Sequence, residues 1–188
     1  MTTLSILLIG LTIYIAYIYY VKSLKVDKVI EIKEGETKRI TKEKGEFPAS
    51  ISKSYYMVKQ WIFVFFMMIE GGVIMSAIQS LLRYSKVSFE GMFGVIFLTL
   101  VPAFGCLGSK SVRTIHLVGA ATGFVLLVSM FWITFGHWYI SVFALIVAAY
   151  TYFKHKESNL TFWIENNLIL FVIFEGLLIE TLIKMLSL

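Results

Sequence analysis

The stretch WIFVFFMMIEGGVIMSAIQSLL, residues 61–82, decides the class of protein. Between Lys59 and Arg83 its only ionisable side chain is Glu70. A bilayer core about 30 Å thick needs about 20 helical residues to cross, because every backbone polar group must be hydrogen-bonded within the segment. The stretch therefore predicts a membrane-spanning helix with a carboxyl group near its middle.

The rest of the chain has the same character. It is 58% hydrophobic and only 15% charged, whereas about a quarter of the residues in a soluble domain are charged. With the central run taken as residues 57–82, the other spans are predicted at residues 3–21, 87–107, 114–135, 138–153 and 160–184. We expect one all-α polytopic transmembrane helix bundle over residues 1–188, with six spans, or five if the short run 138–153 does not cross.

The basic residues predict an orientation. Of the 17 Lys and Arg residues, all but Arg83, Lys86 and Lys184 fall in the first, third and fifth loops. The positive-inside rule then places both termini outside and loop 22–56 in the cytoplasm. We expect an integral protein of a bacterial inner (plasma) membrane. Because topology accounts for the net charge of +5, no nucleic-acid partner is needed.

The loop 22–56 is the one long polar segment, and two interpretations are open for it. It can be a solvated tether, or it can form a small hairpin around Glu34 and Gly35, which needs a docking surface to be stable. Its basic residues suit a protein partner or anionic lipid headgroups. Near its end, Pro48 with Ser50 or Ser52 resembles the start of the next helix, with a serine as the cap.

Residues 47–124 carry a resemblance to known membrane proteins. Pro48, Ile51 and Ser52, then Pro102 to Phe104, then His116, resemble the DRAM-like and Sfk-type family of six-span proteins. The segment from Pro48 to Ser52, with the tyrosine pair after it, is also similar to uncharacterised small membrane proteins of Bacteroidetes and their phages. The resemblance implies a six-helix bundle that senses or handles lipids, with no catalytic residues to transfer. Lys53 departs from the family, in which an acidic residue usually follows the serine.

Small residues predict close helix packing. Gly119 and Gly123 form a GxxxG on the same face as His116, and Gly72 and Ser76 repeat the small-xxx-small spacing with Gln79 on their face. In lipid, small residues let helix backbones approach closely. We expect packing within the chain at these positions, with a homo-oligomer through the GxxxG as the alternative.

Four acidic residues predict the functional face. Glu70 and Glu175 lie at similar depths, and an ionised side chain at mid-bilayer costs about 2.5–3.5 kcal/mol. On a helical wheel of residues 160–184, Glu165, Glu175 and Glu180 share one half. The other half, which includes Asn167 and Leu170, suits lipid.

Two interpretations of the buried acids are open. In the first, the acids form a proton or cation pathway or a polar pocket for a lipid headgroup. Burial favours the protonated acid, and two neighbouring carboxyl groups can share a proton. Alternatively, each neutral Glu is interhelical glue, with a hydrogen bond worth about 0.6 kcal/mol on average. The contact between Glu70 and the last span decides between the two.

No motif predicts an enzyme, a metal site or a cofactor. Nearly 30 Å of helix separates His116 from His137, and His155 lies in another loop, so a shared metal or haem is not expected. The single Cys106 excludes an internal disulfide. We expect a non-enzymatic membrane protein that binds lipid or a protein partner on a buried acidic face. A small proton- or cation-coupled transporter and an intramembrane lipid-modifying enzyme using His116 are the alternatives.

Overall fold

The computed structural model describes residues 3–33, 36–81, 90–98, 101, 107, 109–135, 138–155, 159–167 and 169–170. Most of these residues are helical, so the all-α prediction is confirmed in its coarse form, with one β-hairpin added. The elements are α1 (Thr3–Ser23), β1 (Val26–Lys33), β2 (Glu36–Lys42), the 3-10 helix η1 (Ser52–Tyr56), α2 (Gln60–Leu81), α3 (Glu90–Leu98), α5 (Lys110–Phe135) and α6 (Trp138–His155). Residues 160–167 and 169–170 are also helical.

Two described helices are long and apolar enough to cross a membrane, over Ser5–Ser23 in α1 and Lys110–Ser129 in α5. A shorter apolar segment covers Gln60–Ser76 in α2. A core helix of a soluble protein and a signal sequence have the same length and composition. A core helix is mostly buried, however, whereas only 33% and 22% of the residues in the two segments are. The number of spans stays a prediction.

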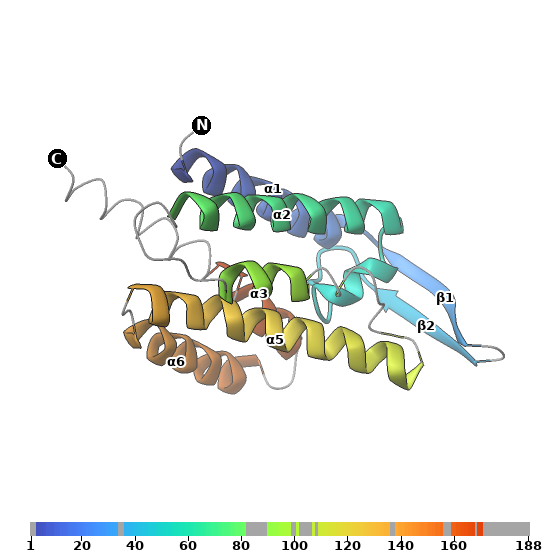
Figure 1. Ribbon diagram of the computed structural model, residues 1–188. Coiled ribbons are helices and arrows are strands. Elements are labelled where there is room, and N and C mark those ends of the chain that lie inside the picture. Colours follow the sequence, from blue (N-terminus) through green and yellow to red (C-terminus); the bar gives the residue numbers. More distant parts are fainter. Residues whose placement is uncertain are drawn as a thin grey trace.

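The helices pack in pairs (Figure 1). α1 lies along α2, α3 lies against α5, and α2 contacts α3 while α6 contacts α5. Tyr17 of α1 stacks on Phe66 of α2, with ring centroids 3.9 Å apart and planes 7° from parallel. The buried core links α1 and α2 with the segment before α2 and the last described helix, through Tyr14, Tyr17, Ile18, Val21, Ile51, Val58, Phe63, Phe66, Val101 and Phe162.

The contact between α3 and α5 depends on two glycines. A Cβ atom added to Gly94 would lie 2.9 Å from the carbonyl oxygen of Gly123, and one added to Gly123 would lie 2.9 Å from the carbonyl oxygen of Gly94. Real Cβ atoms essentially never come so close to other atoms. Gly123, from the predicted GxxxG, therefore lies in a backbone contact within the chain, and Gly119 is buried on the same helix.

The loop after α1 forms a hairpin that docks on the end of that helix. β1 and β2 pair antiparallel, from Val26 opposite Lys42 to Lys33 opposite Glu36. The Lys42 ammonium donates hydrogen bonds to the carbonyl oxygens of Lys22 at 3.1 Å and Leu24 at 2.8 Å. These include carbonyls left without partners at the helix C-terminus, where a positive charge is also favoured by the helix dipole. Burial lowers the pKa of Lys42.

The three loops predicted on the cytoplasmic side meet at the hairpin end of the bundle. The Tyr56 hydroxyl bridges the backbone of Leu107, donating to its carbonyl at 3.2 Å and accepting from its N–H at 3.1 Å. Just before the last described helix, the Asn159 amide donates to the Phe47 carbonyl at 3.1 Å. Within that helix, the Phe162 N–H donates to the Ala49 carbonyl at 3.2 Å. In a bundle whose successive helices alternate in direction, the first, third and fifth loops all lie at the same end, as they do here.

The start of α2 differs from the prediction. α2 begins at Gln60, and the serines before it form hydrogen bonds in and beside η1 instead. The Ser50 hydroxyl accepts a hydrogen bond from the Lys53 N–H at 3.0 Å, and the Ser54 hydroxyl donates to the Ile51 carbonyl at 2.5 Å. The prediction was wrong because the Ser50 hydroxyl bonds to the nearest turn, η1, which ends before α2 begins.

Candidate functional site

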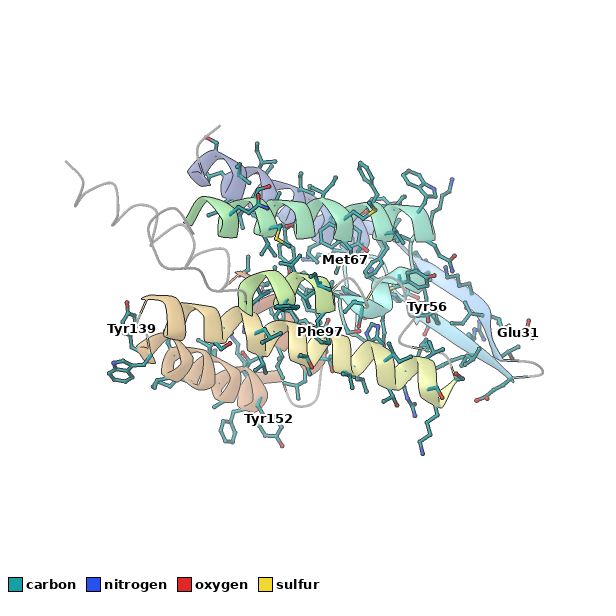
Figure 2. The ribbon with its side chains drawn as sticks, viewed as in Figure 1. Glu31, Tyr56, Met67, Phe97, Tyr139 and Tyr152 are labelled. Atoms are coloured by element: carbon teal, nitrogen blue, oxygen red, sulfur yellow. The ribbon has the colours of Figure 1, made fainter. Side chains whose placement is uncertain are left out.

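A cavity of about 420 Å³ lies between α1, α2, α3, α5 and the last described helix. Its described walls are mainly apolar, and Figure 2 shows Met67 in the space between α2 and α3. The polar or ionisable side chains among them are Tyr14, Ser52, Glu70, His116 and Glu165. Ligand pockets typically have volumes of about 300–1,000 Å³ and mostly apolar walls with a few placed polar groups. The cavity has the size and character of such a pocket.

Glu70 is the least satisfied polar group of this cavity. Its side chain is 6% exposed, and both carboxyl oxygens are buried without a hydrogen-bond partner among the described residues. α1 makes room for it, since a Cβ added to Gly10 would lie 3.4 Å from Glu70 Oε2 and 2.6 Å from Val73 Cγ1. An unpaired buried carboxyl is costly, so its position against a cavity needs a functional explanation.

Glu165 lines the same cavity but has partners. One carboxyl oxygen accepts a hydrogen bond from the Ile51 N–H at 2.5 Å, and the other accepts from the Ser52 hydroxyl at 3.3 Å. These bonds satisfy the first turn of η1 and attach it to the last described helix. Its contacts indicate a structural brace between two segments far apart in the chain.

His116 and Tyr14 complete the polar part of the lining. His116 is buried, and its Nδ1 lies 3.3 Å from the Val101 carbonyl oxygen. The Tyr14 hydroxyl donates a hydrogen bond to the Asn166 side-chain oxygen at 2.9 Å. Tyr14 was missed as a site residue. Its signal was a hydroxyl group in the middle of the first apolar run, where a buried tyrosine needs a partner.

The predicted Gly72 and Gln79 face lies away from the cavity. Both residues are exposed, and a Cβ added to Gly72 would meet no described atom within 4 Å. At 100° per residue, Gln79 is 180° from Glu70 on α2, so a helix that turns Glu70 inward turns Gln79 outward. The prediction of Gln79 as a buried polar residue was therefore wrong. Ser76, between the two faces, is half-buried.

The half of the last helix that was predicted to face lipid contacts protein instead. The Asn167 amide donates to the Thr151 hydroxyl of α6 at 2.7 Å, and Leu170 packs against the core. At this depth both halves of the helix contact protein, because α6 lies on the side opposite Glu165. The predicted acidic residues Glu175 and Glu180 lie outside the described residues, so the proposed approach of Glu175 to Glu70 stays a prediction.

Within the described part of the chain, no three His, Cys, Asp or Glu side chains come together as a metal site. The arrangement can instead accept a ligand with an apolar body and a polar head. Comparison with protein families, with curated proteins and with solved structures finds no match for the chain. The resemblance of residues 47–124 to DRAM-like proteins therefore stays a prediction.

Proposed function

We propose that the protein is an integral membrane protein that binds an amphiphilic, lipid-like molecule in the cavity beside Glu70. Support for the membrane location comes from the outer surface of the bundle. Large apolar side chains project outward from several helices, including Phe65 and Met68 of α2, 60% and 69% exposed, and Val125 of α5, 66% exposed. Soluble monomers rarely expose large continuous apolar patches, whereas lipid requires them.

The aromatic residues of α6 support the same location. Figure 2 shows Tyr139 and Tyr152 projecting away from the bundle, one near each end of this helix. Trp138 accompanies the first and Tyr150 the second, and both are also exposed. Tyrosine and tryptophan are enriched at the two membrane interfaces, where the ring is apolar and its edge is hydrated. α6, the predicted fifth span, therefore has the aromatic pattern of a crossing helix.

The observation that carries the proposal is Glu70. Its carboxyl group is buried, unpartnered among the described residues and part of the wall of an otherwise apolar cavity. A structural glutamate would be expected to have a partner like those of Glu165. A ligand that enters the cavity with its own polar head would supply the missing hydrogen bonds.

The test is to fill the cavity. Ala120 lines it from α5, whereas Ala121 is the next residue and is exposed. We expect Ala120→Phe to reduce binding of radiolabelled dodecanol to the purified protein in maltoside micelles by about tenfold or more. Ala121→Phe adds the same ring outside the cavity and should bind like the wild type. Equal binding by wild type and Ala120→Phe, or no dodecanol binding by the wild type, would contradict the proposal.

A proton or cation pathway is a second candidate, favoured by one observation. Glu70 and Glu165 line the same cavity from helices far apart in the sequence. If protons pass between them, Glu70→Gln should abolish pH-driven flux into liposomes that contain the protein, while its yield and melting temperature stay close to those of the wild type. If the wild-type protein shows no flux, the pathway is excluded as a function, and the proposal of ligand binding is unaffected.

A further inference from the structure

We propose that the ligand of the cavity is a cationic amphiphile, a molecule with one ammonium head and a hydrocarbon tail, and that its head pairs with the Glu70 carboxylate. This inference rests on the proposed function and adds the charge of the ligand to it. It follows from three features of the cavity: the ionisable groups in its walls, the apolar surface beside them and the place where the cavity reaches the surface of the molecule.

The ionisable groups favour a cation. Those in the described lining are Tyr14, Glu70, His116 and Glu165, with no lysine or arginine among them. Glu165 already accepts hydrogen bonds from the segment before α2, and Tyr14 already donates one to Asn166. Glu70 therefore offers two acceptor oxygens with no described donor. A bound ammonium group favours the ionised form of this carboxyl group, because opposite charges attract. Its three N–H donors can then satisfy both oxygens, and its positive charge pairs with the carboxylate.

The remaining surface suits a hydrocarbon tail. From Glu70 the cavity continues along Met67 and Met68 of α2, Val95 and Leu98 of α3 and Phe124 of α5. Methionine side chains are flexible and adapt to chains of different shape. Met68 lines the cavity and is also 69% exposed, so the cavity opens at the surface beside it. On a bundle embedded in lipid, this opening would face the acyl chains, from which an amphiphile enters.

Other charged ligands fit less well. An anionic head would stand beside an unpaired carboxyl group in a region with little water. A hard cation such as Ca²⁺ takes six to eight oxygen ligands. The described side chains of the lining provide oxygen atoms from Tyr14, Ser52, Glu70 and Glu165, and all of these except Glu70 already take part in described hydrogen bonds. An organic ammonium needs fewer oxygens and gains from the apolar walls.

A matched series of twelve-carbon probes tests the proposal. Unlabelled dodecylamine, dodecanol and dodecanoate compete with radiolabelled dodecanol for the purified protein in maltoside micelles at neutral pH. For the wild type, we expect dodecylamine to compete at a concentration about tenfold lower than dodecanol, since a hydrogen bond to a charged group commonly gives such a factor. Dodecanoate should compete more weakly than dodecanol.

Two variants assign the preference to Glu70. In Glu70→Gln, which keeps the shape of the side chain, the amine and the alcohol should compete within threefold of each other. Glu31→Gln removes the same charge from the exposed hairpin (Figure 2) and should keep the tenfold preference, which excludes a general attraction of the amine to the protein.

Several results would overturn the inference. The inference fails if dodecylamine competes no better than dodecanol for the wild-type protein. This result needs no variant, so it is decisive even if Glu70→Gln does not fold. A tenfold preference that survives in Glu70→Gln also overturns the inference. In both cases dodecanol still binds and is lost in Ala120→Phe, so the proposed function stands. If dodecanol itself does not bind to the wild type, the proposed function fails first.

Discussion

Replacing Glu70 by methionine should stabilise the protein. The substitution keeps a long unbranched side chain but removes two carboxyl oxygens that are buried without a described partner. A buried polar group without a hydrogen bond costs about 1–3 kcal/mol. Because no described hydrogen bond is lost, we expect Glu70→Met to raise the free energy of unfolding by a similar amount. The same variant should lose the preference for dodecylamine, so stability and ligand selectivity should change in opposite directions.

Glu165→Met is the matched comparison. Glu165 lines the same cavity, but its carboxyl group accepts hydrogen bonds from the Ile51 N–H and the Ser52 hydroxyl. Ile51 is buried, at 4% exposed, so the substitution leaves its N–H without that partner in a dry position. We expect Glu165→Met to lower the free energy of unfolding by about 1–3 kcal/mol. The same chemical change at two positions of one cavity should thus have opposite signs.

The assay is reversible unfolding in mixed micelles. The purified variants are titrated with dodecyl sulfate in maltoside micelles without added ligand, and tryptophan fluorescence reports the transition. A loss of more than about 1 kcal/mol for Glu70→Met would refute the reasoning, because it would mean that the carboxyl group has a partner that stabilises the fold. Glu70 would then be interhelical glue. Glu31→Met, on the exposed hairpin, controls for the effect of charge removal on dodecyl sulfate binding.

Three further predictions concern the frame around the cavity. Lys42→Met should remove the hydrogen bonds that hold the hairpin on α1, at a cost of about 1.5–3 kcal/mol in unfolding free energy. Amide hydrogen exchange in both strands should then become faster. Lys38→Met, at an exposed position, should leave exchange unchanged. Slow exchange in the first variant would mean that the hairpin docks by other contacts. Gly123→Ala should lower the unfolding free energy by about 1–3 kcal/mol, because its Cβ would lie 2.9 Å from a carbonyl oxygen of α3. Gly72→Ala, in open space, should be neutral or stabilising. Similar melting temperatures for the two variants would contradict the close contact. Lys44→Cys should react with an impermeant maleimide only after the cells are opened, and labelling of intact cells would reverse the proposed orientation.

Parts of the fold could be predicted from composition and periodicity alone. Long apolar runs appear as helices, and the polar loop after the first run forms the hairpin of β1 and β2, which was one of its two interpretations. A helix boundary was harder to place, because the Ser50 hydroxyl accepts a hydrogen bond from η1 and not from α2. Element type depends on local sequence, whereas the exact start of α2 depends on the packing of η1 against Glu165, a residue far away in the chain.

Faces of helices were predicted less well than the helices themselves. A helical wheel states which residues share a side, but not which side is turned inward. Gln79 and Gly72 share a side of α2, as predicted, yet that side is exposed, because Glu70 on the opposite side is the one that meets the cavity. The missing information was the neighbour, since Gly10 of α1 leaves the space in which Glu70 fits. No periodicity within α2 contains it.

The two acids of the cavity show why residue type alone could not assign their roles. Both were predicted on one buried acidic face, either as a pathway or pocket or as interhelical glue, since both interrupt apolar runs. The fold brings a backbone N–H and a hydroxyl to Glu165, which becomes a brace. It places Glu70 beside Gly10 of α1, with no hydrogen-bond donor among the described residues. Both acids line the cavity, but the Glu70 carboxyl group has no hydrogen-bond partner among the described residues and is therefore available to a ligand. For this reason, the opposite stability effects expected for Glu70→Met and Glu165→Met would distinguish a binding group from a structural one.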